Sequence, residues 1–295
     1  MPNSQTSDNY EEKRWTSADG LSLFYRYYPG GEGADERLPV VCLHGLTRNS
    51  RDFEALAQHI ADQGRRVLVP EMRGRGLSDY SPNSSTYTPP QYVEDLERLF
   101  AQEGIDRFIS VGTSMGGLIT MLFAASNPGQ VQGVLMNDIG PEVNPEGLER
   151  IGGYVGQGRS YPTWMHAAKS LQSVHGEAFP DWDLDQWLAM AKRTLVVSQN
   201  GRISYDYDMG IADPFAEPGN AAPTNLWAAF EAVADVPMVL VRGELSDLLT
   251  LETVERMGER NQAMTQVTVP RVGHAPTLDE PEARAAIDAW LRKLA

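Results

Sequence analysis

The most informative segment of the chain places a serine between glycines. Residues 112–117 read Gly-Thr-Ser-Met-Gly-Gly; an apolar run, 107–111, precedes them and a helix-like run begins at Leu118. Small residues on both sides let the backbone turn sharply from a strand into a helix, which leaves the hydroxyl of Ser114 exposed at the helix N-terminus. The segment therefore predicts a strand-to-helix elbow that presents Ser114 as a nucleophile.

A nucleophilic serine needs a base to take its proton and a carboxylate to orient that base. His274 is the candidate base among the five histidines, because it stands in a Val-Gly-His-Ala-Pro turn between the last expected strand and the last helix. Asp247, which follows the preceding strand after a short loop, is the expected acid. Asp138 is the alternative, since it ends an earlier strand and neighbouring strand ends reach the same ring.

These residues are far apart in sequence, so a fold must bring them together. Alternating strands and helices favour an α/β fold with a mostly parallel sheet and helices on both faces, which gathers strand ends at one edge. An antiparallel hairpin over residues 13–28, turning at Asp19-Gly20, precedes that sheet. Strands are expected at 40–43, 66–69, 108–111, 131–139, 237–242 and 265–269, and helices at 50–63, 91–103, from 118 to about 127, and 282–294.

The alternation breaks between residues 140 and 235. We expect a helical cap there, inserted into a core formed by residues 1–139 and 236–295, with helices near 161–173 and 185–195. Trp164 and Trp187 are the candidate substrate-binding residues, because aromatic side chains build the walls of mostly apolar pockets. They favour an apolar or aromatic substrate. The alternative is an ordinary helical subdomain with its own core.

Composition narrows the possible partners. The 295 residues carry a formal net charge of −15, which argues against nucleic acid and anionic membrane surfaces, since both attract clustered Lys and Arg. The N-terminus is polar, and no apolar run reaches the roughly 20 residues of a membrane span, so we expect a cytoplasmic protein. Cys42 lies in an apolar strand and is expected to be a buried, inert thiol. No metal-binding pattern is visible.

Beyond the elbow, two further motifs carry a resemblance. His44-Gly45 follows the first parallel strand, and residues 73–78 read Arg-Gly-Arg-Gly-Leu-Ser. Together with residues 112–116 they resemble, in order and spacing, the α/β-hydrolase fold family with a helical cap. The chain departs from many relatives at Glu71, where they carry Asp.

The resemblance implies the roles of single residues. Ser114 becomes the nucleophile, Asp247 the orienting acid and His274 the base, while the backbone N–H groups of Leu46 and Met115 form the oxyanion hole. His44 is expected to support that loop by hydrogen bonding. The remaining histidines, His59, His166 and His175, are expected on surface helices or in the cap.

The expected reaction is hydrolysis of a carboxylic ester or lactone through an acyl-Ser114 intermediate, with no cofactor. Relatives that attack with an aspartate are excluded by the serine at the elbow. One alternative is carbon–carbon hydrolysis of meta-cleavage diketones, although those enzymes usually carry Asn where this chain has Thr113. Another alternative is a ligand-binding receptor that keeps the serine, histidine and aspartate of the catalytic triad. Arg48, Arg159 and Arg202 are candidates to hold a substrate carboxylate, the alternative being solvated or paired arginines.

Overall fold

The computed structural model describes residues 9–216 and 225–294. In this part of the chain eight strands form one sheet in the order β1-β2-β4-β3-β5-β6-β10-β11. β1 pairs antiparallel with β2, and β2 with β4, whereas the remaining neighbours are parallel. The strands are β1 (Glu11–Thr16), β2 (Ser22–Tyr28), β3 (Val40–Leu43), β4 (Val67–Pro70), β5 (Phe108–Thr113), β6 (Val131–Asn137), β10 (Met238–Gly243) and β11 (Met264–Val269).

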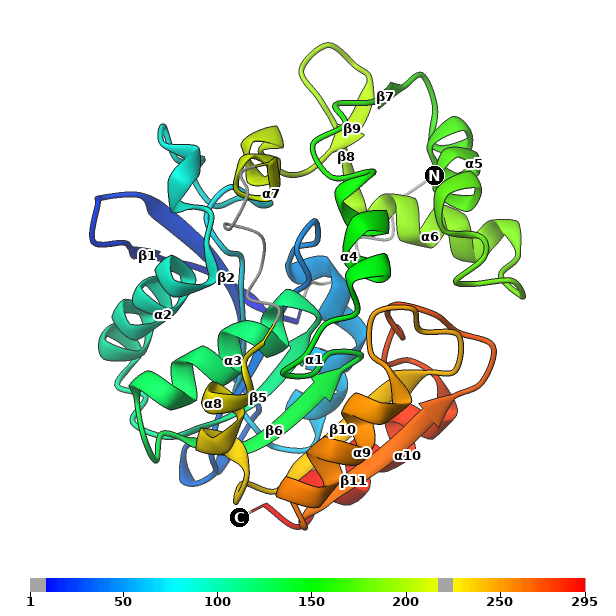
Figure 1. The fold of residues 1–295 in the computed structure, drawn as a ribbon. Helices are drawn as coiled ribbons and strands as arrows, with labels where there is room; N and C mark the ends of the chain where they lie inside the picture. The colour runs from blue at the N-terminus through cyan, green and yellow to red at the C-terminus, as the bar shows by residue number, and fades with distance from the viewer. Residues whose placement is uncertain (1–8, 217–224, 295) are drawn as a thin grey trace.

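Helices cover both faces of this sheet, which is why its inner strands are apolar along their whole length (Figure 1). One hydrophobic cluster joins the sheet to α2, α3, α8 and α9 and includes Phe100, and a second joins the opposite face to α1 and α10 and includes Ile60. The helices are α1 (Glu54–Asp62), α2 (Pro89–Glu103), α3 (Met115–Ser126), α8 (Trp227–Phe230), α9 (Leu251–Arg260) and α10 (Pro281–Leu291).

The predicted α/β architecture and its N-terminal hairpin are confirmed, with shifts at element ends. The strand expected over 131–139 stops at Asn137, because Asp138 turns out of it with φ 54°. The helix expected over 50–63 opens with a 3-10 turn, Ser50–Phe53, before α1 begins. Cys42 is fully buried, as expected.

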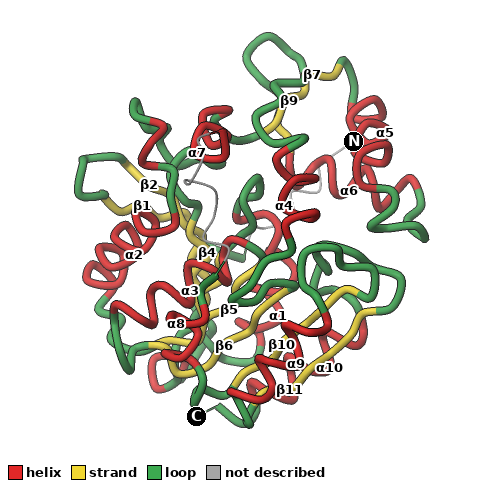
Figure 2. Tube along the Cα trace, in the orientation of Figure 1, coloured by secondary structure: helices red, strands yellow, loops and turns green. Residues whose placement is uncertain are grey.

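Between β6 and β10 the chain leaves the sheet and builds a separate layer beyond its carboxyl edge (Figure 1). Three short strands form an antiparallel sheet in the order β7-β9-β8, which the sequence did not predict (Figure 2). α8 instead packs on α3, beside the main sheet. The other elements of this stretch are α4 (Pro145–Gly152), β7 (Ser160–Tyr161), α5 (Trp164–His175), α6 (Leu184–Thr194), β8 (Leu195–Val197), β9 (Ile203–Tyr205) and α7 (Asp213–Ala216).

Within residues 9–216 and 225–294, no helix combines the length and the apolar character needed to cross a membrane.

Candidate active site

Ser114 stands at a sharp elbow between β5 and α3. Its backbone has φ 51° and ψ −115°, a conformation that L residues adopt only when the surrounding structure imposes it. The neighbouring glycines make the turn possible: a Cβ on Gly112 would lie 2.6 Å from the Gly116 carbonyl carbon, and one on Gly116 would lie 2.0 Å from the Leu43 carbonyl oxygen. The Gly-x-Ser-x-Gly spacing therefore follows from close backbone packing.

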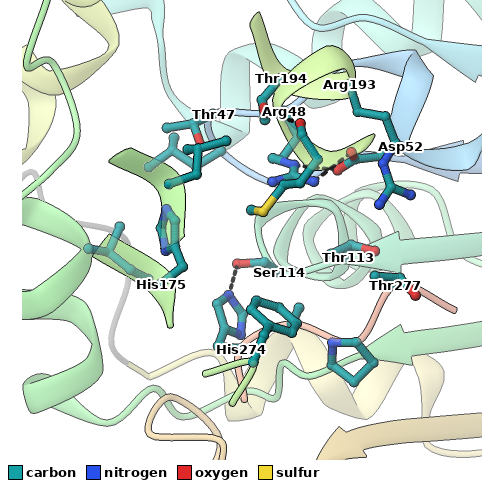
Figure 3. A pocket seen from close by; sticks show the side chains of 18 of the residues that line it. Thr47, Arg48, Asp52, Thr113, Ser114, His175, Arg193, Thr194, His274 and Thr277 are labelled. Carbon is teal, nitrogen blue, oxygen red and sulfur yellow. Dashed lines mark hydrogen bonds and ion pairs between the residues drawn. The ribbon is translucent and has the colours of Figure 1, made fainter. Parts of the chain in front are cut away.

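The structure brings Ser114 and His274 together across the sheet edge. The Ser114 hydroxyl lies 2.9 Å from His274 Nε2, as Figure 3 shows. The other ring nitrogen, Nδ1, lies 2.8 Å from Oδ2 of Asp138. A carboxylate can only accept at that position, so Nδ1 carries the hydrogen and Nε2 is left to accept from the serine. This is the tautomer that a general base requires.

Asp138 is held rigidly at the end of β6. Its side chain is fully buried, and Oδ1 accepts a hydrogen bond of 2.9 Å from the backbone N–H of Gly243. Oδ2 accepts a second hydrogen bond, 2.6 Å long, from the hydroxyl of Ser246. Because a buried carboxylate is costly unless it is hydrogen-bonded, these donors explain how Asp138 is tolerated and kept in place.

The expectation for Asp247 needs correction, since the hydrogen bond to His274 comes from Asp138. Asp247 lies in the predicted loop, but its carboxylate pairs with the guanidinium of Arg150 on α4, with Oδ1 2.9 Å from Nη2. The residue before it, Ser246, faces Asp138 instead. Ser246 and Asp247 thus face different partners. The carboxylate that reaches the ring of His274 belongs to Asp138, the alternative acid.

The predicted oxyanion donors lie on the two segments beside Ser114. Met115 is the first residue of α3, so its N–H has no acceptor within the helix. On the other segment, the carbonyl of Gly45 accepts hydrogen bonds from His44 Nδ1 (2.8 Å) and from the Arg48 N–H (3.1 Å). In a trans peptide the N–H points opposite to the C=O, so these two bonds fix the direction of the Leu46 N–H.

His44 supports this loop as a neutral ring. Its Nε2 accepts a hydrogen bond of 3.1 Å from the Met72 N–H, which makes Nδ1 the donor to Gly45. The ring is fully buried, and burial lowers the pKa of His44 to about 4. The predicted hydrogen bond from His44 to this loop is present.

The Arg-Gly-x-Gly-x-Ser loop, residues 73–78, also supports this region. Arg75 is fully buried and donates from Nε to the Leu46 carbonyl oxygen at 3.0 Å. Glu71, the departure from the family pattern, accepts from the N–H and hydroxyl of Ser50 and from the N–H of Leu77. The longer carboxylate therefore still ties this loop to the turn that precedes α1.

A cavity opens above Ser114, with a volume of about 110 Å³. The loops of the main sheet provide its floor, and elements between β6 and β10 provide much of the wall. Its lining includes Gly45, Leu46, Thr47, Arg48, Asp52, Phe53, Thr113, Ser114, Ile151, Tyr154, Leu171, His175, Phe179, Trp182, Met190, Arg193, Thr194, Tyr205, Tyr207 and His274 to Thr277.

Neither predicted tryptophan, Trp164 or Trp187, is among these lining residues. Trp182 lines the cavity instead and stacks on Phe179, with ring centroids 4.1 Å apart. Trp187 is fully buried behind that pair, its ring edge-on to Trp182 at 4.9 Å. Trp187 packs in the core of the insertion, as expected from the alternative of an ordinary helical subdomain with its own core.

Of the three candidate arginines, only Arg48 lines the cavity. Arg159 borders a different surface hollow, and Arg202 is exposed and donates to Ser160. His175, expected on a surface helix or in the cap, lies at the end of α5 and does line the cavity. His175 follows Leu171 by four residues, so both side chains lie on one face of α5. This spacing predicts that they point the same way, but it does not predict what they contact.

The fold and the serine elbow are those of an α/β hydrolase. The sequence profile of the Alpha/beta hydrolase family matches residues 40–287, and the chain belongs to this family. It is 37% identical over 262 residues to a 3-hydroxybutyrate-oligomer hydrolase of Cupriavidus necator, covering 86% of this chain and 88% of that protein. It is 25% identical to a 2-(acetamidomethylene)succinate hydrolase of Mesorhizobium japonicum, covering 82% of this chain and 84% of that protein.

A solved structure supports the same assignment. The crystal structure of an α/β hydrolase from Novosphingobium aromaticivorans is 54% identical, with a TM-score of 0.92, and the alignment covers 97% of this chain and 99% of that chain. The insertion between β6 and β10 is therefore part of an architecture shared with that protein.

Proposed function

We propose that this chain hydrolyses a carboxylic ester through an acyl intermediate on Ser114, with His274 as the base and Asp138 as the acid that orients it. The observation that carries this proposal is the unbroken hydrogen-bonded series from Ser114 Oγ through both nitrogens of His274 to Asp138. Family membership supports hydrolysis as the reaction class.

Acylation follows from the tautomer of His274. Nε2 takes the proton of the Ser114 hydroxyl as Oγ attacks the carbonyl carbon, and Asp138 stabilises the imidazolium that forms. The negative charge that develops on the carbonyl oxygen faces the N–H groups of Leu46 and Met115, each worth roughly 3 kcal/mol in such sites. The ester C–O bond then breaks, and His274 returns the proton to the leaving alcohol.

Deacylation repeats these steps with water. His274 removes a proton from a water molecule that attacks the acyl carbon, and it returns that proton to Ser114 Oγ as the acyl–Oγ bond breaks to release a carboxylic acid. The overall reaction consumes one ester and one water and yields one acid and one alcohol, so it requires no cofactor. A lactone passes through the same steps.

In this proposal the region between β6 and β10 is the cap that the sequence predicts between residues 140 and 235. This region supplies much of the cavity wall, including Tyr154, His175 and Trp182. Its side chains therefore determine which substrates fit the cavity. Because a relative with 37% identity is a 3-hydroxybutyrate-oligomer hydrolase, the dimer and trimer of 3-hydroxybutyrate are the first natural esters to test.

Pre-steady-state kinetics with p-nitrophenyl butyrate test the proposal. We expect a burst of p-nitrophenol followed by steady turnover, and Ser114→Ala should lose both while keeping the circular dichroism spectrum of the wild type. Turnover that survives in Ser114→Ala would contradict the proposal. Turnover of a meta-cleavage diketone without any ester hydrolysis would favour the carbon–carbon alternative, and acylation without turnover would favour the receptor.

A further inference from the structure

We propose that the cavity holds an ester carrying a carboxylate, which is bound by the guanidiniums of Arg48 and Arg193. This inference rests on the proposed function and names the substrate class of the same site. Figure 3 shows both arginines with Asp52 on one side of Ser114, while His175 lies on the other side.

Arg48 has a donor group available to an anion. Its Nε and Nη2 bind the two oxygens of Asp52 at 2.6 and 2.7 Å, which leaves Nη1 outside the paired fork. Burial favours the neutral form of Asp52, but Arg48 and Arg193 lower its pKa below the ordinary value. The carboxylate is therefore charged, and it orients Arg48 without using all of its donors.

Arg193 offers a second donor on the same wall. Its Nε is buried and has no hydrogen-bond partner among the described residues, which is rare for a buried polar group and costly without a ligand. The carboxylate of Asp279 lies 3.8 Å from Nη1 of Arg193, beyond hydrogen-bond distance. The guanidinium of Arg193, a residue that lines the cavity, therefore keeps an unused hydrogen-bond donor, Nε.

The other groups facing the cavity do not cancel this positive charge. Two guanidiniums and one carboxylate, that of Asp52, line the cavity, while Asp279, outside the lining, forms a long ion pair of 3.8 Å with Arg193. Burial, together with Arg48, Arg150 and His274, lowers the pKa of His175 to about 4, so its ring is neutral at pH 7. Burial also raises the pKa of Tyr154, Tyr205 and Tyr207, which keeps those hydroxyls neutral. The wall therefore favours a negatively charged group.

The side chain of Arg48 begins close to the nucleophile Ser114. A Cβ on Gly45 would lie 3.3 Å from Arg48 Cγ and 3.8 Å from Ser114 Cβ, so the stem of Arg48 starts beside the reacting serine. Because the guanidinium lies at the end of this stem, we expect only a short chain between the bound carboxylate and the scissile carbonyl. Short half esters and hydroxy-acid esters meet this requirement.

Two matched pairs of esters test the proposal. Monoethyl glutarate is compared with ethyl 5-methylhexanoate, in which an isopropyl group replaces the carboxylate on the acyl side. The 3-acetoxybutanoate anion is compared with its methyl ester by acetate release, which places the carboxylate on the alcohol side. We expect a preference in kcat/KM of roughly tenfold to a hundredfold for the charged member of at least one pair, the size of one charge-assisted hydrogen bond.

Substitutions assign that preference to the two arginines. Arg48→Met and Arg193→Met should each reduce the charged-to-neutral ratio by about threefold to tenfold, each arginine supplying part of the preference, mainly through KM, whereas Asp52→Asn should increase it by freeing Arg48. Because Arg48→Met leaves Asp52 unpaired, the double variant Arg48→Met/Asp52→Asn repeats the test without an isolated carboxylate. Arg98→Met, on the exposed face of α2, changes the net charge equally and should leave the ratio unchanged.

The outcomes separate this inference from the proposed function. Equal rates within both ester pairs, together with a normal burst on p-nitrophenyl butyrate, would overturn the carboxylate site and leave the esterase intact. A preference that persists unchanged in the arginine variants would also overturn it. Loss of the burst on every ester would overturn the proposed function itself.

Discussion

The hydroxyl of Ser246 donates to Oδ2 of Asp138, the same oxygen that accepts the hydrogen bond from His274. The loop after β10, which the sequence indicated as the source of the acid, thus supplies a donor to the acid instead. Asp138 takes the place expected for Asp247, whose carboxylate pairs with Arg150, so substituting the two aspartates should have different effects.

Asp138→Asn should lower kcat by about four orders of magnitude, because an amide donor at this position favours the wrong tautomer of His274. Asp247→Asn is the matched control and should change kcat by less than tenfold, since its carboxylate pairs with Arg150. Ester hydrolysis by the two purified variants measures both effects. A larger loss in Asp247→Asn than in Asp138→Asn would refute the assignment.

Ser246→Ala removes one of the hydrogen bonds to Asp138. We expect a decrease in kcat of roughly tenfold with little change in KM, because a hydrogen bond to a charged group contributes about 1.5–3 kcal/mol and this one holds the position and charge of the acid. Steady-state kinetics on one ester provide the measurement. Ser126→Ala, exposed at the end of α3, serves as the control, and equal kcat in all three proteins would show that Ser246 has no positioning role.

Gly116→Ala should destabilise the protein and reduce activity. Its new Cβ would lie 2.0 Å from the Leu43 carbonyl oxygen, so α3 must move away from β3, at a cost of roughly 1–3 kcal/mol or more. Gly152→Ala, in α4 with no heavy atom within 4 Å of the added Cβ, should leave stability unchanged or raise it slightly. Urea unfolding of both variants compares them, and equal free energies of unfolding would contradict the packing account.

Acid should destabilise the fold through His44, whose pKa is about 4 in the folded protein against an ordinary value of 6.5. Between these values the unfolded chain binds a proton that the folded chain does not, so this stability is complete above pH 6.5 and is lost as the pH falls toward 4. The full effect is about 3 kcal/mol. His44→Asn removes the titrating ring.

The free energy of unfolding at pH 7 and pH 5 gives the comparison. The wild type should lose about 2 kcal/mol more than His44→Asn over this interval, since the other histidines titrate equally in both proteins. An identical decline in the two proteins would show that the His44 ring does not control the acid response.

Sequence patterns predicted the sheet, the hairpin and the elbow because these depend on local periodicity and on glycine spacing. The pairing of Ser114 with His274 was also accessible, since both were expected at the carboxyl edge of the sheet. The acid was not, because Asp138 and Asp247 follow neighbouring strands and side-chain direction within a short loop is decided by tertiary packing. The cavity wall escaped prediction for a similar reason: helical spacing groups Leu171 with His175 but does not reveal which face turns inward.

Locating the acyl group on the chain tests directly whether Ser114 is the nucleophile. The wild-type protein is mixed with p-nitrophenyl butyrate, quenched in acid during the burst and digested, and the peptides are analysed by mass spectrometry. We expect a butyryl group on the peptide containing Ser114, attached to that serine and absent from Ser114→Ala. Ester turnover with no acylated peptide, or with the acyl group on another residue, would contradict this role of Ser114.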